Sequence, residues 1–296
     1  MARPQRKKSI RTASASSRKC WKKNARANFT GSKLKPASKK TACWMDKTPV
    51  TNEQYQHFLK ANPKHPAPNV KQDWAKPYNW NGRDFPKGAE KHPVVLVSWN
   101  DAQAFCKWAG KVLPTDLQWE KSARGIDGRR WPWGSTWNRD NCNSASWWAK
   151  KDLFEEKEWR EWWDNVFGKE LSGKKIMTTP VGQFGIEPPY GCVDSAGNVW
   201  EWCEDFYDEQ KFRQVLRGGA WYLRLHYVAC SIRNGDEPDV RNSSIGFRCA
   251  RTPFAQRAKS IALGALGQTY FPRIWWLTGC QSVEQWVFIA LVRCSV

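Results

Sequence analysis

The side chains best suited to redox or metal chemistry in this chain are its ten cysteines and four histidines. No two cysteines have the spacing of a zinc knuckle. The histidines lie far apart in the sequence, at His57, His65, His92 and His226. Within residues 222–244 the one cysteine is Cys230. A soft metal ion such as Cu(I) prefers two thiolates, so a single thiolate does not make a site for it. The residue types therefore define no self-contained catalytic centre.

Three short motifs follow one another between residues 185 and 252: Gly-Asn-Val-Trp-Glu-Trp, Arg-Gly-Gly-Ala-Trp and Ile-Gly-Phe-Arg-Cys-Ala. The pair Gly218 and Gly219 allows a bulge and a close backbone approach before Trp221 packs. Together the motifs resemble the formylglycine-generating enzyme (sulfatase-modifying factor) family. The resemblance covers residues 44–251 and implies an α+β fold of the C-type-lectin-like kind, with irregular loops and few short strands.

The resemblance implies an enzyme that oxidises a substrate cysteine with two copper-holding cysteines, placed shortly after the Arg-Gly-Gly motif. In this sequence the two positions hold Leu223 and Val228. Cys249 matches a position that is commonly structural, and the His-rich iron site of the related sulfoxide synthases has no counterpart. We therefore expect no bound copper and no enzymatic activity. The alternative is a residual formylglycine-forming enzyme.

The resemblance also implies a structural calcium ion in the loop of the first motif. The ligands carried over to this sequence are the carboxylates of Asp194 and Glu201 and the carbonyls of Gly197 and Val199. Hard oxygen donors in one tight loop are what Ca²⁺ accepts. The alternative is that the two carboxylates only cap turns. A second family site would start near residues 143–144, but no matching aspartate follows it.

The segment 222–244 differs in character from the motifs around it. Many non-catalytic relatives carry asparagine runs here, and variable proteins of diversity-generating retroelements use this same scaffold. In those systems mutagenesis of adenines turns AAC codons into NNC codons, which do not encode Trp, Lys, Gln, Met or Glu. The fifteen residues 222–236 contain none of these five types. The alternative is an ordinary loop in a degenerate family member.

We therefore expect a non-catalytic, ligand-binding variable protein of a diversity-generating retroelement. Its hypervariable region would span residues 215–250 and display side chains on one exposed surface, where aromatic and Arg residues contact a protein or other macromolecular ligand. The expected ligand-binding positions are Tyr222, Leu223, Arg224, His226, Tyr227, Ile232, Asn234, Gly235, Asp236, Val240, Ser243 and Ser244.

Three helices and one strand are predicted to support these segments. A first helix follows Thr51, which makes a capping box with Gln54 and precedes an apolar face. Residues 94–97 predict a buried strand, and a second helix starts within residues 98–101 and stops at Gly110. A third capped helix begins at Thr115. The family's opening strand, which normally ends in Met-Gly, is either diverged or missing.

Residues 147–177 depart from the family pattern. Their apolar residues recur at near-helical spacing and predict an inserted amphipathic helix that packs on the domain. The apolar positions are Leu153, Phe154, Trp159, Trp162, Trp163 and Val166. The alternative is a helix that binds a partner.

The formal net charge of +20 is concentrated near the start of the chain, where residues 1–40 hold 14 Lys and Arg and no Asp or Glu. We expect a basic, disordered extension over 1–43, the family domain over 44–252 and a tail of unknown structure over 253–296. The extension could touch an anionic partner non-specifically, so a nucleic-acid-associated protein is a further alternative. Neither a secretory signal nor a bilayer-spanning run is present, which predicts mostly reduced cysteines and, by default, a cytoplasmic location.

Overall fold

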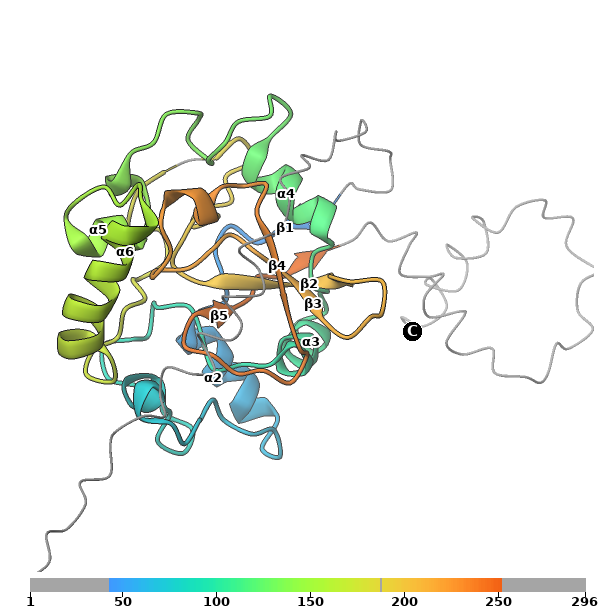
Figure 1. The fold of residues 1–296 in the computed structure, drawn as a ribbon. Coiled ribbons are helices and arrows are strands. Elements are labelled where there is room, and N and C mark those ends of the chain that lie inside the picture. Colours follow the sequence, from blue (N-terminus) through green and yellow to red (C-terminus); the bar gives the residue numbers. More distant parts are fainter. Residues whose placement is uncertain (1–42, 187, 252–296) are drawn as a thin grey trace, which may run out of the picture. The chain divides into compact units, whose positions relative to one another are not determined.

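The computed structural model describes residues 43–186 and 188–251. The chain divides into two units, Met1–Arg251 and Thr252–Val296, and all described residues belong to the first. The predicted basic extension, except its last residue, and the tail 253–296 lie outside the described residues. The described part is a mixture of short helices and short strands joined by long loops, as Figure 1 shows. No helix in it is long and apolar enough to cross a membrane.

Three helices begin with a capping box, as the sequence predicts. They are α2 (Asn52–Ala61), α3 (Trp99–Trp108) and α4 (Asp116–Arg124), with Thr51, Ser98 and Thr115 as their N-caps. In each, the N-cap hydroxyl accepts a hydrogen bond from the backbone N–H of the residue three positions later. The side chain of that later residue in turn accepts a hydrogen bond from the N-cap N–H. Because both partners lie within one turn, these helix starts are fixed locally.

The main sheet has four strands in the order β4-β3-β2-β5. The strands are β2 (Trp200–Phe206), β3 (Gln214–Arg217), β4 (Arg233–Asp236) and β5 (Ile245–Gly246). β3 pairs antiparallel with β2 and β4, whereas β5 pairs parallel with β2. Glu201 of β2 lies opposite Arg217 on one side and Gly246 on the other. The pairing therefore brings the three motifs side by side, although they are spread over some 50 residues of sequence.

The opening strand of the family is present in a diverged form, since β1 (Trp44–Met45) pairs antiparallel with β6 (Ala250–Arg251). Residues 94–97 are buried as predicted, but they do not form the predicted strand. Leu96 has a φ of 59°, which takes the backbone out of the extended region. The Leu96 N–H donates to the Asn242 carbonyl and the Val94 N–H to the Val50 carbonyl, so the segment bonds to two separate loops.

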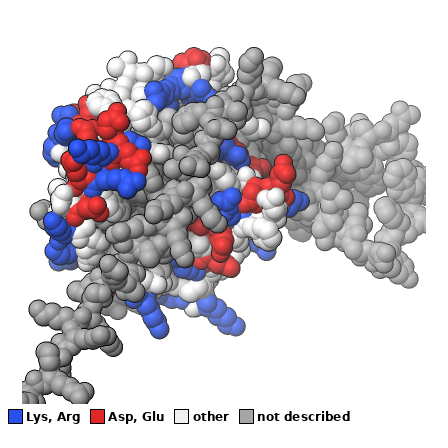
Figure 2. All heavy atoms as spheres, viewed as in Figure 1, with Lys and Arg blue, Asp and Glu red and all other residues white. Residues whose placement is uncertain are grey.

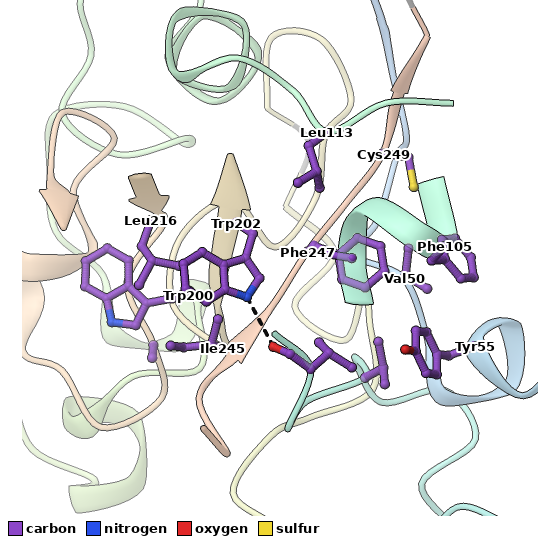
Figure 3. Packing of buried hydrophobic residues seen from close by; sticks show 14 of the residues in the cluster. Val50, Tyr55, Phe105, Leu113, Trp200, Trp202, Leu216, Ile245, Phe247 and Cys249 are labelled. Atoms are coloured by element: carbon purple, nitrogen blue, oxygen red, sulfur yellow. Dashed lines mark hydrogen bonds between the residues drawn. The ribbon is translucent and has the colours of Figure 1, made fainter. Parts of the chain in front are cut away.

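The hydrophobic core lies between the sheet and helices α2 and α3. Figure 3 shows Trp202 of β2 beside Phe247, which follows β5, with Phe105 and Tyr55 of the two helices beyond. The Trp202 indole N–H donates to the Val97 carbonyl at 3.2 Å, and the rings of Phe247 and Phe105 meet edge to face at 5.4 Å. The aromatic residues of the motifs are therefore core residues that fix the strand ends.

The inserted segment 147–177 folds as α5 (Ala145–Ala149), α6 (Glu156–Trp162) and a π-helix (Trp163–Leu171). It buries Trp159 and Trp162 as predicted, but Phe154 and Val166 are 49% and 38% exposed. Phe154 precedes the helix. The π-helix bonds each N–H to the carbonyl five residues earlier and is wound more widely than an α-helix, so Phe167 takes the buried place expected for Val166.

The outer face of this insertion carries charges of both signs. Arg160 pairs with Glu156 along α6, and the Lys151 Nζ lies 2.7 Å from the Glu158 carboxylate. Figure 2 shows blue and red atoms interspersed over the side of the molecule where Figure 1 places α5 and α6. Such a mixed surface is typical of a solvated face, which supports the prediction of a helix that packs on the domain over that of a partner-binding helix.

Candidate functional site

A buried ion pair joins the first and third motifs. The Arg248 guanidinium donates to both Glu201 carboxylate oxygens, through Nε at 2.6 Å and Nη2 at 2.7 Å. The Trp119 indole N–H donates to the same carboxylate at 2.7 Å, and both charged side chains are 0% exposed. Burial alone would lower the pKa of Arg248, but the Glu201 charge raises it above its ordinary value. The Arg248 guanidinium therefore stays charged, and its bonds to Glu201 connect β2 to the chain after β5.

The carboxylates of the predicted calcium site are already engaged by protein groups in this arrangement. The Glu201 carboxylate is satisfied by Arg248 and Trp119, so a cation would compete with a guanidinium for it. Asp194 lies nearby in a left-handed turn (φ 58°) and accepts from the Gly182 N–H at 2.6 Å. Burial raises the pKa of Asp194 to about 6. Within residues 43–186 and 188–251, no three His, Cys, Asp or Glu side chains group as metal ligands.

The carbonyls of Gly197 and Val199 belong to a loop that is shaped by protein contacts. A Cβ on Gly197 would lie 2.1 Å from the Asn143 carbonyl oxygen, so only glycine fits there. The Asn143 side chain is itself fully engaged: its amide donates to the Met177 carbonyl at 2.8 Å and its Oδ1 accepts from the Trp148 indole at 2.7 Å. Asn143 therefore ties the loop to the insertion, a role that the sequence analysis missed.

The two positions that correspond to copper-binding cysteines are core positions here. Leu223 is 4% exposed and Val228 is 0% exposed, both in the main hydrophobic cluster. Burial raises the pKa of the Cys230 thiol to about 12. The Cys106 thiol donates to the Cys249 sulfur at 3.3 Å, and this contact together with burial raises the pKa of Cys106. The thiols of Cys230 and Cys106 are therefore protonated at neutral pH and poorly suited to bind a metal or attack a substrate.

The insertion lies over the start of the predicted variable segment. The Trp159 indole N–H donates to the Tyr222 carbonyl at 2.7 Å, and the Arg224 guanidinium donates to the Phe154 carbonyl at 3.1 Å. The rings of Phe167 and Trp221 are 5.0 Å apart. The backbone around Leu223 is thus covered from outside by a segment that the family pattern lacks.

The predicted ligand-binding residues divide into a partly exposed and a buried group. The partly exposed group is Tyr222, Arg224, His226, Tyr227, Ile232, Asn234, Asp236 and Val240. The buried group, for which the expected exposure is wrong, is Leu223, Gly235, Ser243 and Ser244. Leu223 packs in the core, and a Cβ on Gly235 would lie 2.3 Å from the Tyr207 ring. The two serines run directly into β5, where the Ser244 carbonyl accepts from the Trp200 N–H at 2.8 Å.

The residues 224–227 form a face against the loop that contains Trp131. The Arg224 guanidinium lies 5.5 Å from the Tyr227 ring centre, and the His226 Nδ1 is 2.7 Å from an Arg130 nitrogen. The Trp131 indole N–H donates to the Leu225 carbonyl at 3.2 Å. Burial, followed by the charges of Arg130 and Arg224, lowers the pKa of His226, so the imidazole is neutral at pH 7.

Comparison with known proteins places this architecture in a family. Residues 23–253 match the sulfatase-modifying factor enzyme 1-like domain. The inactive C-alpha-formylglycine-generating enzyme 2 of Bos taurus is 39% identical over 166 residues, which are 53% of this chain and 50% of that protein. The formylglycine-generating enzyme of Streptomyces coelicolor is 33% identical over 201 residues, or 60% of this chain and 57% of the enzyme. The chain belongs to the sulfatase-modifying factor family and spans about half the length of these curated relatives.

One solved structure supports the fold expected from the sequence. PvdO from Pseudomonas aeruginosa superposes with a TM-score of 0.50 at 20% identity, over 71% of this chain and 80% of PvdO. Variable protein 1 of Treponema denticola matches with a TM-score of 0.42 at 23% identity, over 71% and 84% of the two chains. The predicted α+β, C-type-lectin-like fold of the formylglycine-generating-enzyme type is confirmed.

Proposed function

We propose that this protein is a non-catalytic, ligand-binding member of the family, the variable protein of a diversity-generating retroelement. The observation that carries the proposal is the burial of Leu223 and Val228, at 4% and 0% exposure, where a catalytic member would carry its copper-binding cysteines. A pair of branched apolar side chains in a packed core gives Cu(I) no soft ligand. The same backbone is covered by the insertion through Trp159.

The binding half of the proposal is supported by the partly exposed group of residues. Arg224, His226 and Tyr227 cluster on one turn, and Arg, aromatic and imidazole side chains supply contact area and directional hydrogen bonds. Their neighbours on the chain are buried and held by the core. A rigid framework with exchangeable side chains is the requirement for a surface that varies without unfolding.

The retroelement assignment is tested in the DNA that flanks the coding region. A nearby template repeat should match the codons of residues 215–250, with mismatches confined to adenines of the template. Mismatches should concentrate at codons of the partly exposed group. A template repeat that is absent, or one with mismatches at all four bases, contradicts the assignment.

The display of the variable residues is tested with two matched libraries on the yeast surface. In the first library the codons of Arg224, His226, Tyr227, Asn234 and Asp236 are randomised to NNC. Most of its members should resist protease as the native chain does, because these side chains are partly exposed. The control library draws the buried positions Leu223, Val228, Gly235, Ser243 and Ser244 from the same codons and should be mostly cleaved. Equal cleavage of both libraries would contradict the proposed surface.

A further inference from the structure

A surface pocket of about 710 Å³ lies in the loop that follows Trp131. It is lined by residues 133–141 together with Asp152 of the insertion. None of these residues belongs to the predicted variable set, so the pocket is part of the constant framework. Its volume falls within the range of small-ligand sites, about 300–1,000 Å³.

Two tryptophans provide the apolar part of the pocket. The ring centres of Trp133 and Trp137 are 5.9 Å apart at 49°, and the buried Trp131 stacks behind Trp133 at 6.2 Å and 6°. Their indole N–H groups are already engaged, that of Trp133 by the Thr136 carbonyl at 3.0 Å and that of Trp137 by the Asp152 carboxylate at 2.9 Å. The rings are therefore fixed in orientation, and what they offer a ligand is aromatic surface.

The remaining lining is rich in hydroxyl, amide and carboxylate groups. Ser135, Thr136, Asn138 and Asn141 can each donate or accept hydrogen bonds. The charged lining has a small negative excess, since one cation, Arg139, stands with two carboxylates, Asp140 at 3.9 Å and Asp152. A pocket of this kind has no concentrated positive charge for a phosphate and no apolar interior for a lipid.

We propose that the pocket binds a neutral carbohydrate, of one or two sugar rings. A pyranose has an apolar face of C–H groups, whose positive edge suits the negative face of an indole ring, and a rim of hydroxyls that both donate and accept. Trp133 and Trp137 match the first feature, and the amides and carboxylates around them match the second. The fixed orientation of both indoles lowers the entropy lost when a sugar binds.

Trp131 links this pocket to the variable segment, and this step rests on the proposed function. The Trp131 indole N–H donates to the Leu225 carbonyl, and Arg130 contacts His226. Arg224 reaches the Phe154 carbonyl, two residues beyond the pocket residue Asp152. The constant pocket would hold a sugar unit while Arg224 and His226, on the segment that Trp131 contacts, select what is attached to it.

Saturation-transfer difference NMR on the full chain tests the sugar site, with cellobiose, maltose, lactose and chitobiose at millimolar concentration as probes. At least one disaccharide should receive saturation at its ring C–H protons. The signal should be lost in Trp133→Ala and weakened at least several-fold in Asn141→Ala, which leaves the aromatic stack intact. Trp44→Ala is the matched control, because Trp44 is 66% exposed on β1 and does not line the pocket, and it should keep the signal. Near-ultraviolet circular dichroism verifies the fold of each variant.

Three results would overturn the sugar site: no transfer to any of the four disaccharides, equal transfer in folded Trp133→Ala, or transfer to tetramethylammonium in place of the sugars. Failure of the sugar site leaves the proposed function standing if the first yeast library still folds. Conversely, disaccharide saturation that is lost in folded Trp133→Ala supports the sugar site also where the flanking DNA holds no template repeat, so the two failures are distinguishable.

Discussion

Replacement of Arg248 by Met tests the central support of the motif region. The substitution keeps an unbranched apolar stem but removes the guanidinium, and it leaves the Glu201 carboxylate in the core with only the Trp119 N–H as donor. It also removes the donor of the Val193 carbonyl, which Arg248 Nη2 meets at 2.8 Å. Because both partners are 0% exposed, water cannot replace the lost bonds without opening the core. Breaking such a buried pair from one side costs about 3–5 kcal/mol of the free energy of unfolding.

The assay is equilibrium unfolding in urea, followed by tryptophan fluorescence and by far-ultraviolet circular dichroism. Arg160→Met is the matched control, since Arg160 pairs with Glu156 at the surface with both side chains well exposed (63% and 38%). That exposed pair should contribute no more than about 0.5 kcal/mol. A loss below about 1 kcal/mol for Arg248→Met, or one equal to that of the control, would refute the reasoning.

Three further predictions follow from the same residues. Chelation of divalent cations should leave the melting temperature unchanged, because the Arg248 guanidinium already neutralises the Glu201 carboxylate. A fall in melting temperature on chelation that Asp194→Asn abolishes would instead support the calcium site expected from the sequence. Leu223→Asn should cost about 2–5 kcal/mol because the position is buried, whereas Asp236→Asn should stay within about 0.5 kcal/mol, both measured by urea unfolding. The raised pKa of Asp194, about 6, means that the folded state binds more protons than the unfolded state. The resulting contribution to the free energy of unfolding is complete below the unfolded pKa and is lost as pH rises through about 6. Relative to Asp194→Asn, the native chain should therefore lose on the order of 2–3 kcal/mol of unfolding free energy between about pH 4 and pH 7. Stability profiles of the two proteins that run parallel with pH would contradict this.

The helix starts were predictable because their determinants are local. Each capping box uses two residues three apart, as in Thr51 and Gln54, and no distant contact is needed to fix it. The fold class was predictable for a different reason, since the three motifs form β2, the turn after β3, and β5. Most of their apolar residues lie in one core cluster, with Trp221 and Val199 in two others, so the motifs themselves supply the residues that pack the core.

The parts that the sequence did not predict depend on long-range contacts. Leu96 adopts a positive φ because its N–H meets a carbonyl some 146 residues later, that of Asn242. The π-helix shifts the buried face from Val166 to Phe167, and an apolar pattern alone cannot distinguish an α-helical from a π-helical turn over so short a segment. Glu201 was predicted as a calcium ligand from its loop, whereas Arg248, 47 residues away, satisfies its charge.

The candidate binding residues were predicted from codon composition, which is independent of burial. It therefore grouped partly exposed residues such as Arg224 and Tyr227 with buried ones such as Leu223 and Ser243. A signal in the sequence could have separated some of them, because apolar and polar residues alternate from Leu223 to His226, and the apolar ones are buried. The pocket at residues 133–141 had no such signal, since Asp152 joins it from another segment.

Whether the protein binds or catalyses is tested most directly by incubating the purified chain with Cu(I), oxygen, a thiol reductant and a cysteine-containing sulfatase peptide. Mass spectrometry and aldehyde-specific labelling follow conversion of the peptide thiol to formylglycine. Because Leu223 and Val228 stand where two thiolates are needed, the proposal predicts no aldehyde above a metal-free blank. Copper-dependent formylglycine formation that Cys230→Ser abolishes would contradict the account.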